Sequence, residues 1–225
     1  MTGPIRLAAL DMAGTTVADE GAVEEAFQAA LDAVGLVAGD LMDDPGAYIR
    51  RTMGQSKIAV FTELLGGDRH RAEAANTAFE AAFDQAVDRG EVAALDGAED
   101  ALRALRAGGV RLCLTTGFSP ATRDRILTAL GWQGLVDLVL SPADAGRGRP
   151  WPDMILTAVL RLRIDDVAEV AVAGDTTSDL IAGTRAGASI VAGVLTGAHS
   201  AEELGRAPHT HLLESVAELP GLLPG

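Results

Sequence analysis

The feature that most constrains the fold is an alternation of short apolar runs with segments of helical periodicity. Helices are expected over 120–130, 152–162 and 178–186, the first of them capped by Ser119 with Pro120 at its first position. This alternation predicts an α/β fold whose parallel sheet is covered by helices on both faces. The predicted strands are Ile5–Leu10, Val110–Leu114, Val136–Leu140, Glu169–Ala173 and Ser189–Leu195.

Residues 20–89 interrupt this alternation, because they contain helical patterns only. An insertion at the carboxyl end of the first strand lies over the crevice where parallel sheets bind their ligands. We therefore predict two domains: an α/β core formed by residues 1–19 and 90–225, and an α-helical cap formed by residues 20–89. The helices expected in the cap are Ala22–Val34, Pro45–Thr52, Ser56–Leu65 and Arg69–Arg89.

The charge balance argues against several classes of partner. The 225 residues include 32 acidic and 18 basic side chains, for a formal charge of −14. Such a chain has no basic stripe to neutralise nucleic acid and is not attracted to an anionic membrane surface. No apolar run approaches the ~20 residues of a membrane span, and the first residues lack the basic segment of a secretory signal. We expect a cytoplasmic protein, in which the single cysteine, Cys113, forms no internal disulfide.

The basic residues are unusual in kind. Seventeen are arginines and one is a lysine, Lys57. One interpretation is chance in a composition so strongly biased toward arginine. The other is chemistry that a guanidinium cannot perform, because only an amine loses its proton readily and attacks a carbonyl carbon.

Polar side chains suited to metal and phosphate chemistry follow the predicted strands. Asp11 follows the first strand, Thr116 the second, and Asp175 and Asp179 the fourth, while Arg149 supplies a cation. Because parallel strands end at one edge of a sheet, these side chains are expected to converge. Carboxylate oxygens in this number suit Mg²⁺, and a threonine hydroxyl with nearby N–H groups suits an anion.

This set of residues resembles the haloacid dehalogenase (HAD) superfamily over nearly the whole chain. The first motif supplies Asp11, the second Thr116, the third Arg149, and the fourth reads GDTTSD over residues 174–179. The resemblance implies a Rossmann-like parallel sheet with an inserted helical cap. It also implies that Thr116, Gly117 and Arg149 bind the phosphoryl group of a small substrate.

By the same resemblance, Asp11 attacks phosphorus and forms an aspartyl-phosphate. Mg²⁺ is expected between Asp11, the backbone carbonyl of Ala13 and Asp175. Asp179 is expected among or close to the residues that surround these ligands. The physical need is clear, because a phosphoryl dianion and a carboxylate repel each other unless a metal and cations offset the charge.

Ala13 departs from most phosphatases of this superfamily, which carry an aspartate there as general acid and base. Losing such help typically costs ~10²–10⁴-fold in rate. The phosphonatase branch, phosphonoacetaldehyde hydrolase, avoids this cost, and the chain resembles that branch closely. The resemblance lies in the DMAGTT motif of residues 11–16, in Arg149, and in the MGQSK stretch of residues 53–57.

The phosphonatase resemblance implies a mechanism in which Lys57 forms a protonated Schiff base with phosphonoacetaldehyde. The iminium withdraws electrons when Asp11 takes the phosphoryl group, so the carbon leaves as a neutral enamine without an acid at position 13. Met53 and Gly54 are expected to line the pocket beside the amine. Closure of the cap would bring Lys57 to the core, and the resemblance also implies a homodimer formed through the cap.

Three departures from phosphonatase affect substrate recognition. A histidine three residues after the lysine is replaced by Val60, a tyrosine after the second motif by Phe118, and a cysteine by Gly21 or Ala22. From the resemblance and these departures, we expect the substrate to be phosphonoacetaldehyde or a related phosphonate that carries a carbonyl group. The alternatives are a phosphomonoester phosphatase acting on a small metabolite, a binding protein that keeps the phosphate pocket, and, more weakly, a dehalogenase.

Overall fold

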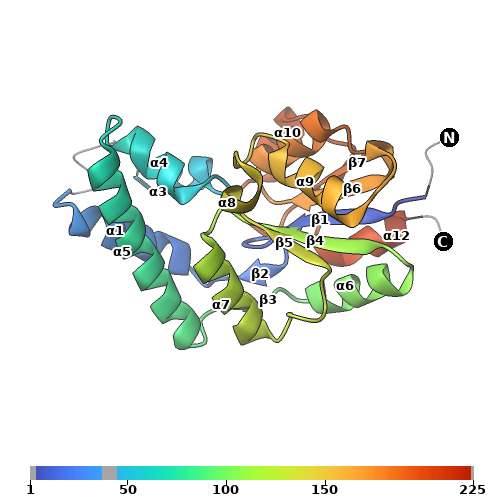
Figure 1. The fold of residues 1–225 in the computed structure, drawn as a ribbon, viewed down its shortest axis with the longest axis horizontal. Helices are drawn as coiled ribbons and strands as arrows, with labels where there is room; N and C mark the ends of the chain where they lie inside the picture. The colour runs from blue at the N-terminus through green and yellow to red at the C-terminus, as the bar shows by residue number, and fades with distance from the viewer. Residues whose placement is uncertain (1–3, 37–44, 224–225) are drawn as a thin grey trace.

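The core of the molecule is a six-stranded parallel sheet, which confirms the predicted α/β fold (Figure 1). The computed structural model describes residues 4–36 and 45–223. Neighbouring strands are parallel throughout this sheet, in the order β5-β4-β1-β6-β7-β8. The strands are β1 Leu7–Asp11, β4 Arg111–Thr115, β5 Leu138–Leu140, β6 Val170–Gly174, β7 Ile190–Val194 and β8 His211–Leu213.

Strand β1 lies between β4 and β6 and is buried on both faces. Ala8 and Leu10 belong to the larger apolar core, whereas Leu7 and Ala9 belong to a second core on the opposite face. This two-sided burial explains why the strand is a continuous apolar run without polar alternation. The covering helices are α6 Ala98–Ala107, α7 Pro120–Leu130 and α12 Leu219–Leu222 on the first face, and α9 Asp153–Leu162 and α10 Thr177–Ala186 on the second.

The element boundaries lie within a few residues of those expected from the sequence. Helix α7 begins at Pro120, and the Ser119 side chain accepts a hydrogen bond from the backbone N–H of Thr122, as the cap pattern predicts. A two-stranded antiparallel ribbon of β2 (Val17–Ala18) and β3 (Ala93–Ala94) was not predicted from the sequence. The remaining short elements are α8 Pro142–Ala145, α11 Ala201–Arg206 and the 3₁₀ turns Val167–Glu169 and Val216–Glu218.

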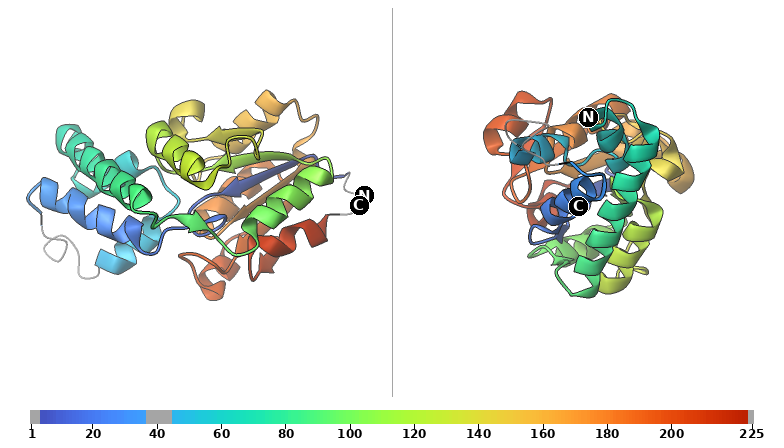
Figure 2. Two further views of the ribbon diagram at one scale, coloured as in Figure 1. Left: turned by 90° about the horizontal axis from the view of Figure 1, so that it is seen from below. Right: turned by 90° about the vertical axis from the view of Figure 1, so that its left-hand side faces the viewer.

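Between β2 and β3, the residues that the structure describes form four helices, which lie as a group beside the sheet and are called the helical segment (Figures 1 and 2). Its interior contains a row of aromatic rings in which Phe27 stacks on Phe61 and Phe61 contacts Phe79. No helix in the described part of the chain is long and apolar enough to cross a membrane. The helices of the segment are α1 Ala22–Ala33, α3 Pro45–Thr52, α4 Lys57–Leu64 and α5 Arg69–Asp88.

Two leucines provide a matched test of the core packing. Leu102 on α6 is fully buried, whereas Leu160 on α9 is 78% exposed. Replacing a buried leucine by alanine removes apolar burial and leaves a cavity, so we expect Leu102→Ala to lower the free energy of unfolding by about 2–5 kcal/mol. Leu160→Ala is expected to change it by less than about 0.5 kcal/mol. Urea denaturation measures both, and equal losses would contradict the packing described here.

Candidate active site

The sheet brings the predicted acidic residues together at its carboxyl edge. Asp11 is the last residue of β1 and is in register with Thr115 of β4, so Thr116 follows beside it. Asp175 comes directly after β6, which pairs with β1 on its other side. Asp179 lies in the first turn of α10, which begins two residues after Asp175. Parallel strands end at one edge of the sheet, so these residues come together as expected. The side chains of Asp11, Thr116, Asp175 and Asp179 are buried there.

Three carboxylates and one guanidinium form the centre of the site. One oxygen from each of Asp11, Asp175 and Asp179 lies within 4.8 Å of the others. The Nη1 atom of Arg149 is 2.5 Å from Oδ1 of Asp11 and also contacts Oδ1 of Asp179. Arg149 is therefore placed beside the expected nucleophile.

Burial of these carboxylates disfavours their charged forms. Desolvation raises the pKa of Asp11 well above its ordinary value; Arg149 opposes this effect, and Asp179 and Asp175 add to it. Desolvation, with the charge of Asp179 as the next cause, raises the pKa of Asp175 to about 6. Three carboxylates facing one guanidinium carry an excess of negative charge, which a bound divalent cation would offset. Their hard oxygen atoms fit Mg²⁺.

Backbone and hydroxyl groups fix the orientation of Asp175. The backbone N–H of Ala198 donates to its Oδ2 at 2.7 Å, and the hydroxyl of Thr15 donates to its Oδ1 at 3.3 Å. Gly14 has a φ of +77°, and a Cβ atom there would lie 2.5 Å from Oδ2 of Asp175. A glycine at this position therefore lets the loop after β1 approach the carboxylate.

Hydrogen bonds from Thr176 and Arg149 fix the orientation of Asp179. Its Oδ2 accepts from the backbone N–H of Thr176 at 3.1 Å and from the Thr176 hydroxyl, while the Thr176 side chain caps α10. Its other oxygen contacts Arg149. Both oxygens thus have protein partners, which is compatible with the expected place of Asp179 around the metal ligands.

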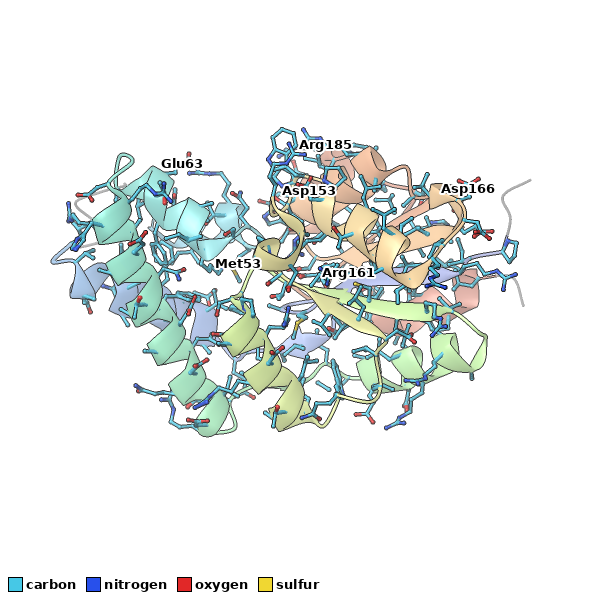
Figure 3. The ribbon with its side chains drawn as sticks, in the orientation of Figure 1. Met53, Glu63, Asp153, Arg161, Asp166 and Arg185 are labelled. Carbon is cyan, nitrogen blue, oxygen red and sulfur yellow. The ribbon has the colours of Figure 1, made fainter. Side chains whose placement is uncertain are left out.

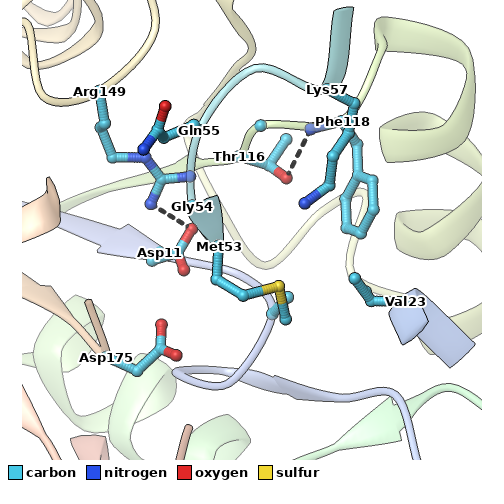
Figure 4. Close-up of a pocket in the computed structure, with 12 residues that line it drawn as sticks. Asp11, Val23, Met53, Gly54, Gln55, Lys57, Thr116, Phe118, Arg149 and Asp175 are labelled. Atoms are coloured by element: carbon cyan, nitrogen blue, oxygen red, sulfur yellow. Dashed lines mark hydrogen bonds and ion pairs between the residues drawn. The ribbon is translucent and has the colours of Figure 1, made fainter. Parts of the chain in front are cut away.

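The loop after β4 presents groups for an anion. The Thr116 hydroxyl accepts from the backbone N–H of Phe118 at 3.2 Å and keeps its own hydrogen to donate. Gly117 lies between them, and all three residues line the same cavity as Asp11 and Arg149 (Figure 4). Phosphoryl oxygens in this cavity would find a hydroxyl, backbone amides and a guanidinium.

The loop before α4 reaches from the helical segment into this cavity. Met53, Gly54 and Lys57 line it together with the core residues, and Met53 lies at the junction between segment and sheet (Figure 3). A Cβ atom at Gly117 would lie 2.2 Å from the backbone oxygen of Gln55. The segment and the core therefore meet through backbone at a place where a larger residue does not fit.

Lys57 is buried at the first position of α4, and its amine points into the cavity (Figure 4). Desolvation, with the charge of Arg149 as the next cause, lowers the pKa of Lys57 to about 8. Asp19, Asp11 and Glu24 act in the opposite direction. The amine thus carries a proton less firmly than an ordinary lysine does.

Several neighbours of the cavity carry no recognisable signal in the sequence. Val23 and Gln55 line it, but their contact depends on how the helical segment lies on the core. Val60, at the place of the phosphonatase histidine, is buried in the apolar core. Gly21 caps α1 with a φ of +90°, and Ala22 is buried beside it. The positions that depart from phosphonatase are therefore filled by apolar packing or by a helix cap.

Known proteins with similar sequences include a probable phosphatase and phosphonoacetaldehyde hydrolases. The chain is 29% identical over 218 residues to probable phosphatase IndB of Dickeya dadantii, covering 96% of this chain and 92% of that protein. It is 32% identical over 152 residues to phosphonoacetaldehyde hydrolase of Pseudomonas putida W619, but this match spans only 57% of the chain and 55% of that enzyme.

Solved structures share the fold. The crystal structure of a phosphonoacetaldehyde hydrolase like protein from Oleispira antarctica matches with a TM-score of 0.83 at 24% identity, covering 98% of this chain and 92% of that one. The family model described as haloacid dehalogenase-like hydrolase matches residues 5–187. The chain therefore belongs to the haloacid dehalogenase-like hydrolases.

Proposed function

We propose that this hydrolase cleaves the carbon–phosphorus bond of phosphonoacetaldehyde or a related carbonyl phosphonate. The observation that carries the proposal is the buried amine of Lys57 in the same cavity as Asp11. Ala13, which also lines that cavity, supplies no acid for an alkoxide leaving group. An amine that activates the carbon side of the bond removes the need for such an acid.

The phosphoryl half of the reaction uses residues of the core. Asp11 attacks phosphorus and becomes an aspartyl-phosphate, which water then hydrolyses to inorganic phosphate. Arg149, Thr116 and Gly117 hold the phosphoryl oxygens and stabilise the charge that develops on them. The ion pair between Arg149 and Asp11 supports this assignment, because it fixes the cation beside the attacking oxygen.

The carboxylates of Asp11 and Asp175 and the backbone carbonyl of Ala13 would hold Mg²⁺, with Asp179 beside them. The cluster of three buried carboxylates supports this fit. The ion would supply positive charge that offsets the repulsion between Asp11 and the phosphoryl dianion.

The carbon half of the reaction uses Lys57. Its neutral amine adds to the aldehyde carbon, and loss of water gives a protonated imine. When Asp11 bonds to phosphorus, the electrons of the carbon–phosphorus bond move into the imine and leave an enamine. Protonation of its carbon and hydrolysis release acetaldehyde and the free lysine. The net reaction consumes one water and yields acetaldehyde and phosphate.

We propose residues 20–89 as a cap domain that delivers Met53, Gly54 and Lys57 to the core of residues 1–19 and 90–225. The close approach of Gly117 to the Gln55 carbonyl supports this role. A homodimer formed through the cap and a cytoplasmic location stay predictions of the phosphonatase resemblance and the composition.

A second candidate is a phosphomonoester phosphatase acting on a small metabolite. The relative matched over 96% of the chain is named a probable phosphatase, whereas the match to phosphonoacetaldehyde hydrolase of Pseudomonas putida W619 covers 57% of it. This candidate uses Asp11 in the same way but gives Lys57 no covalent role. The two candidates therefore differ in what happens when Lys57 is replaced.

Trapping with borohydride separates the candidates. We expect phosphonoacetaldehyde with borohydride to leave an ethyl group on Lys57 of the wild type, because the imine is reduced after carbon–phosphorus cleavage. In Asp11→Asn the cleavage is blocked, and we expect a phosphonoethyl group instead. Peptide mass spectrometry identifies both adducts, and Lys57 is the chain's only lysine, so the adduct is easily located.

Lys57→Arg is the matched control, since it keeps the charge but cannot form an imine. We expect it to lose phosphonoacetaldehyde turnover. Full turnover by this variant would exclude the carbon–phosphorus mechanism. Hydrolysis of phosphate esters that persists in it would favour the phosphatase candidate.

The pH dependence follows from the lowered pKa of Lys57. The reactive amine is neutral, so below about pH 8 its fraction falls about tenfold for each pH unit. We expect kcat/KM for phosphonoacetaldehyde to rise with pH and to level off above about pH 8. Stopped assays of acetaldehyde release measure the profile. A profile that falls over the same range would contradict a neutral lysine nucleophile.

Gly117→Ala tests the contact between cap and core. The added Cβ atom would lie 2.2 Å from the Gln55 oxygen and displace the loop that carries Lys57. Because displacements of about 1 Å can cost 10²-fold, we expect kcat/KM to fall by about that factor. Gly134→Ala is the control, because a Cβ atom there meets nothing within 4 Å. Wild-type activity in Gly117→Ala would show that catalysis does not need this approach.

A further inference from the structure

An aromatic contact joins the helical segment to the core beside Lys57. Phe118 belongs to the core loop after β4, and its ring centroid is 4.5 Å from that of Phe83 and 6.3 Å from that of Phe79. Phe79 and Phe83 lie one turn apart on α5. All three rings are buried, so Phe118 is packed against two fixed partners from the other part of the chain.

The amine of Lys57 lies against the same rings. Its Nζ atom is 5.5 Å from the ring centroid of Phe79 and 6.0 Å from that of Phe118. Aromatic faces at such distances attract an ammonium group weakly. Their apolar bulk also excludes the water that would hydrate the charged form, and this desolvation is the larger effect on the pKa of Lys57. The rings thus restrict both the position and the hydration of the amine.

Phe118 also borders a second hollow, a groove next to the catalytic cavity. Lys57, Gly117 and Phe118 line both hollows. On its other wall the groove has polar side chains of α5, among them Glu73 and Glu80. The groove therefore borders Lys57 and Phe118 on the side away from Asp11 and Arg149, which line only the catalytic cavity of the two.

We propose that Phe118 is a positioning residue for Lys57: held by Phe79 and Phe83, its ring closes the cavity on the groove side and fixes the amine beside that closure. The inference rests on the proposed covalent role of Lys57. It adds that the ring contact of Phe118 with α5 makes amine chemistry depend on the helical segment lying on the core. This positioning role requires an aromatic ring at position 118 but no hydroxyl group on the ring.

The lone lysine permits a direct test without substrate. Protein grown with lysine labelled with carbon-13 at Cε gives one side-chain signal, whose pH titration reports Lys57 alone. In Phe118→Leu we expect the midpoint to move upward from about 8 toward the ordinary value of 10.5 as water enters. The charged neighbours of the amine, Arg149, Asp19, Asp11 and Glu24, are the same in every variant.

Kinetics give a second measurement. In Phe118→Leu we expect kcat for phosphonoacetaldehyde to fall about 10- to 100-fold, with the inhibition constant of inorganic phosphate unchanged, because Thr116 and Arg149 stay in place. Phe118→Tyr keeps the ring and is expected to restore both the wild-type titration midpoint and kcat. Should Phe118→Leu fail to fold, Phe118→Met removes the ring with a similar volume and carries the same expectation.

Phe27→Leu is the matched control. Phe27 is a buried ring of the same row, but Phe61 separates it from Phe79. We expect its lysine titration to match the wild type. An equal shift in Phe27→Leu, or a wild-type midpoint and kcat in Phe118→Leu, would overturn the positioning role. Failure of the proposed function would appear differently, as carbon–phosphorus cleavage that persists in Lys57→Arg while the titration results stand.

Discussion

Burial of opposite charges in one cavity is the constraint on which this site depends. Desolvation raises the pKa of Asp11 and lowers that of Lys57, so the surroundings favour the neutral form of each group. The charge of Arg149 lowers the pKa of both groups, which favours the charged form of Asp11 and the neutral form of Lys57. The protein alone leaves the carboxylate cluster with uncompensated negative charge. A bound cation would offset this charge and, together with Arg149, favour the ionised form of Asp11.

Two parts of the chain approach each other through backbone beside the cavity. Gly54 has a φ of +75°, and a Cβ atom there would lie 2.9 Å from the Thr176 hydroxyl. Gly117 meets the Gln55 carbonyl in the same way. Side chains at either position would hold the helical segment away from the sheet and hydrate Lys57. Under the proposed function, the glycines where the helical segment meets the core are thus as necessary as the charged residues that line the cavity.

The sequence predicted the residues that strand direction alone determines. Asp11, Thr116 and Asp175 follow parallel strands, so their convergence needed only the order of β and α elements. The contact between Phe118 and α5 was not predictable, because it depends on how a separately packed group of helices rests on the sheet. The β2–β3 ribbon was missed for another reason: with two residues per strand it leaves no periodicity. Sequence patterns in this chain therefore do not predict long-range packing or elements of only two residues.

Lys57 and Arg149 differ in how their surroundings shift the pKa of each side chain. Both are buried cations that line one cavity, but their environments act in opposite directions. Burial lowers the pKa of Arg149, but Asp11 and Asp179 outweigh this effect and raise it above its ordinary value. Burial and the charge of Arg149 lower the pKa of Lys57 to about 8. A guanidinium at position 57 would stay charged and could not attack a carbonyl. Under the proposed function, position 57 needs a side chain that can lose its proton, and the chain's only lysine occupies it.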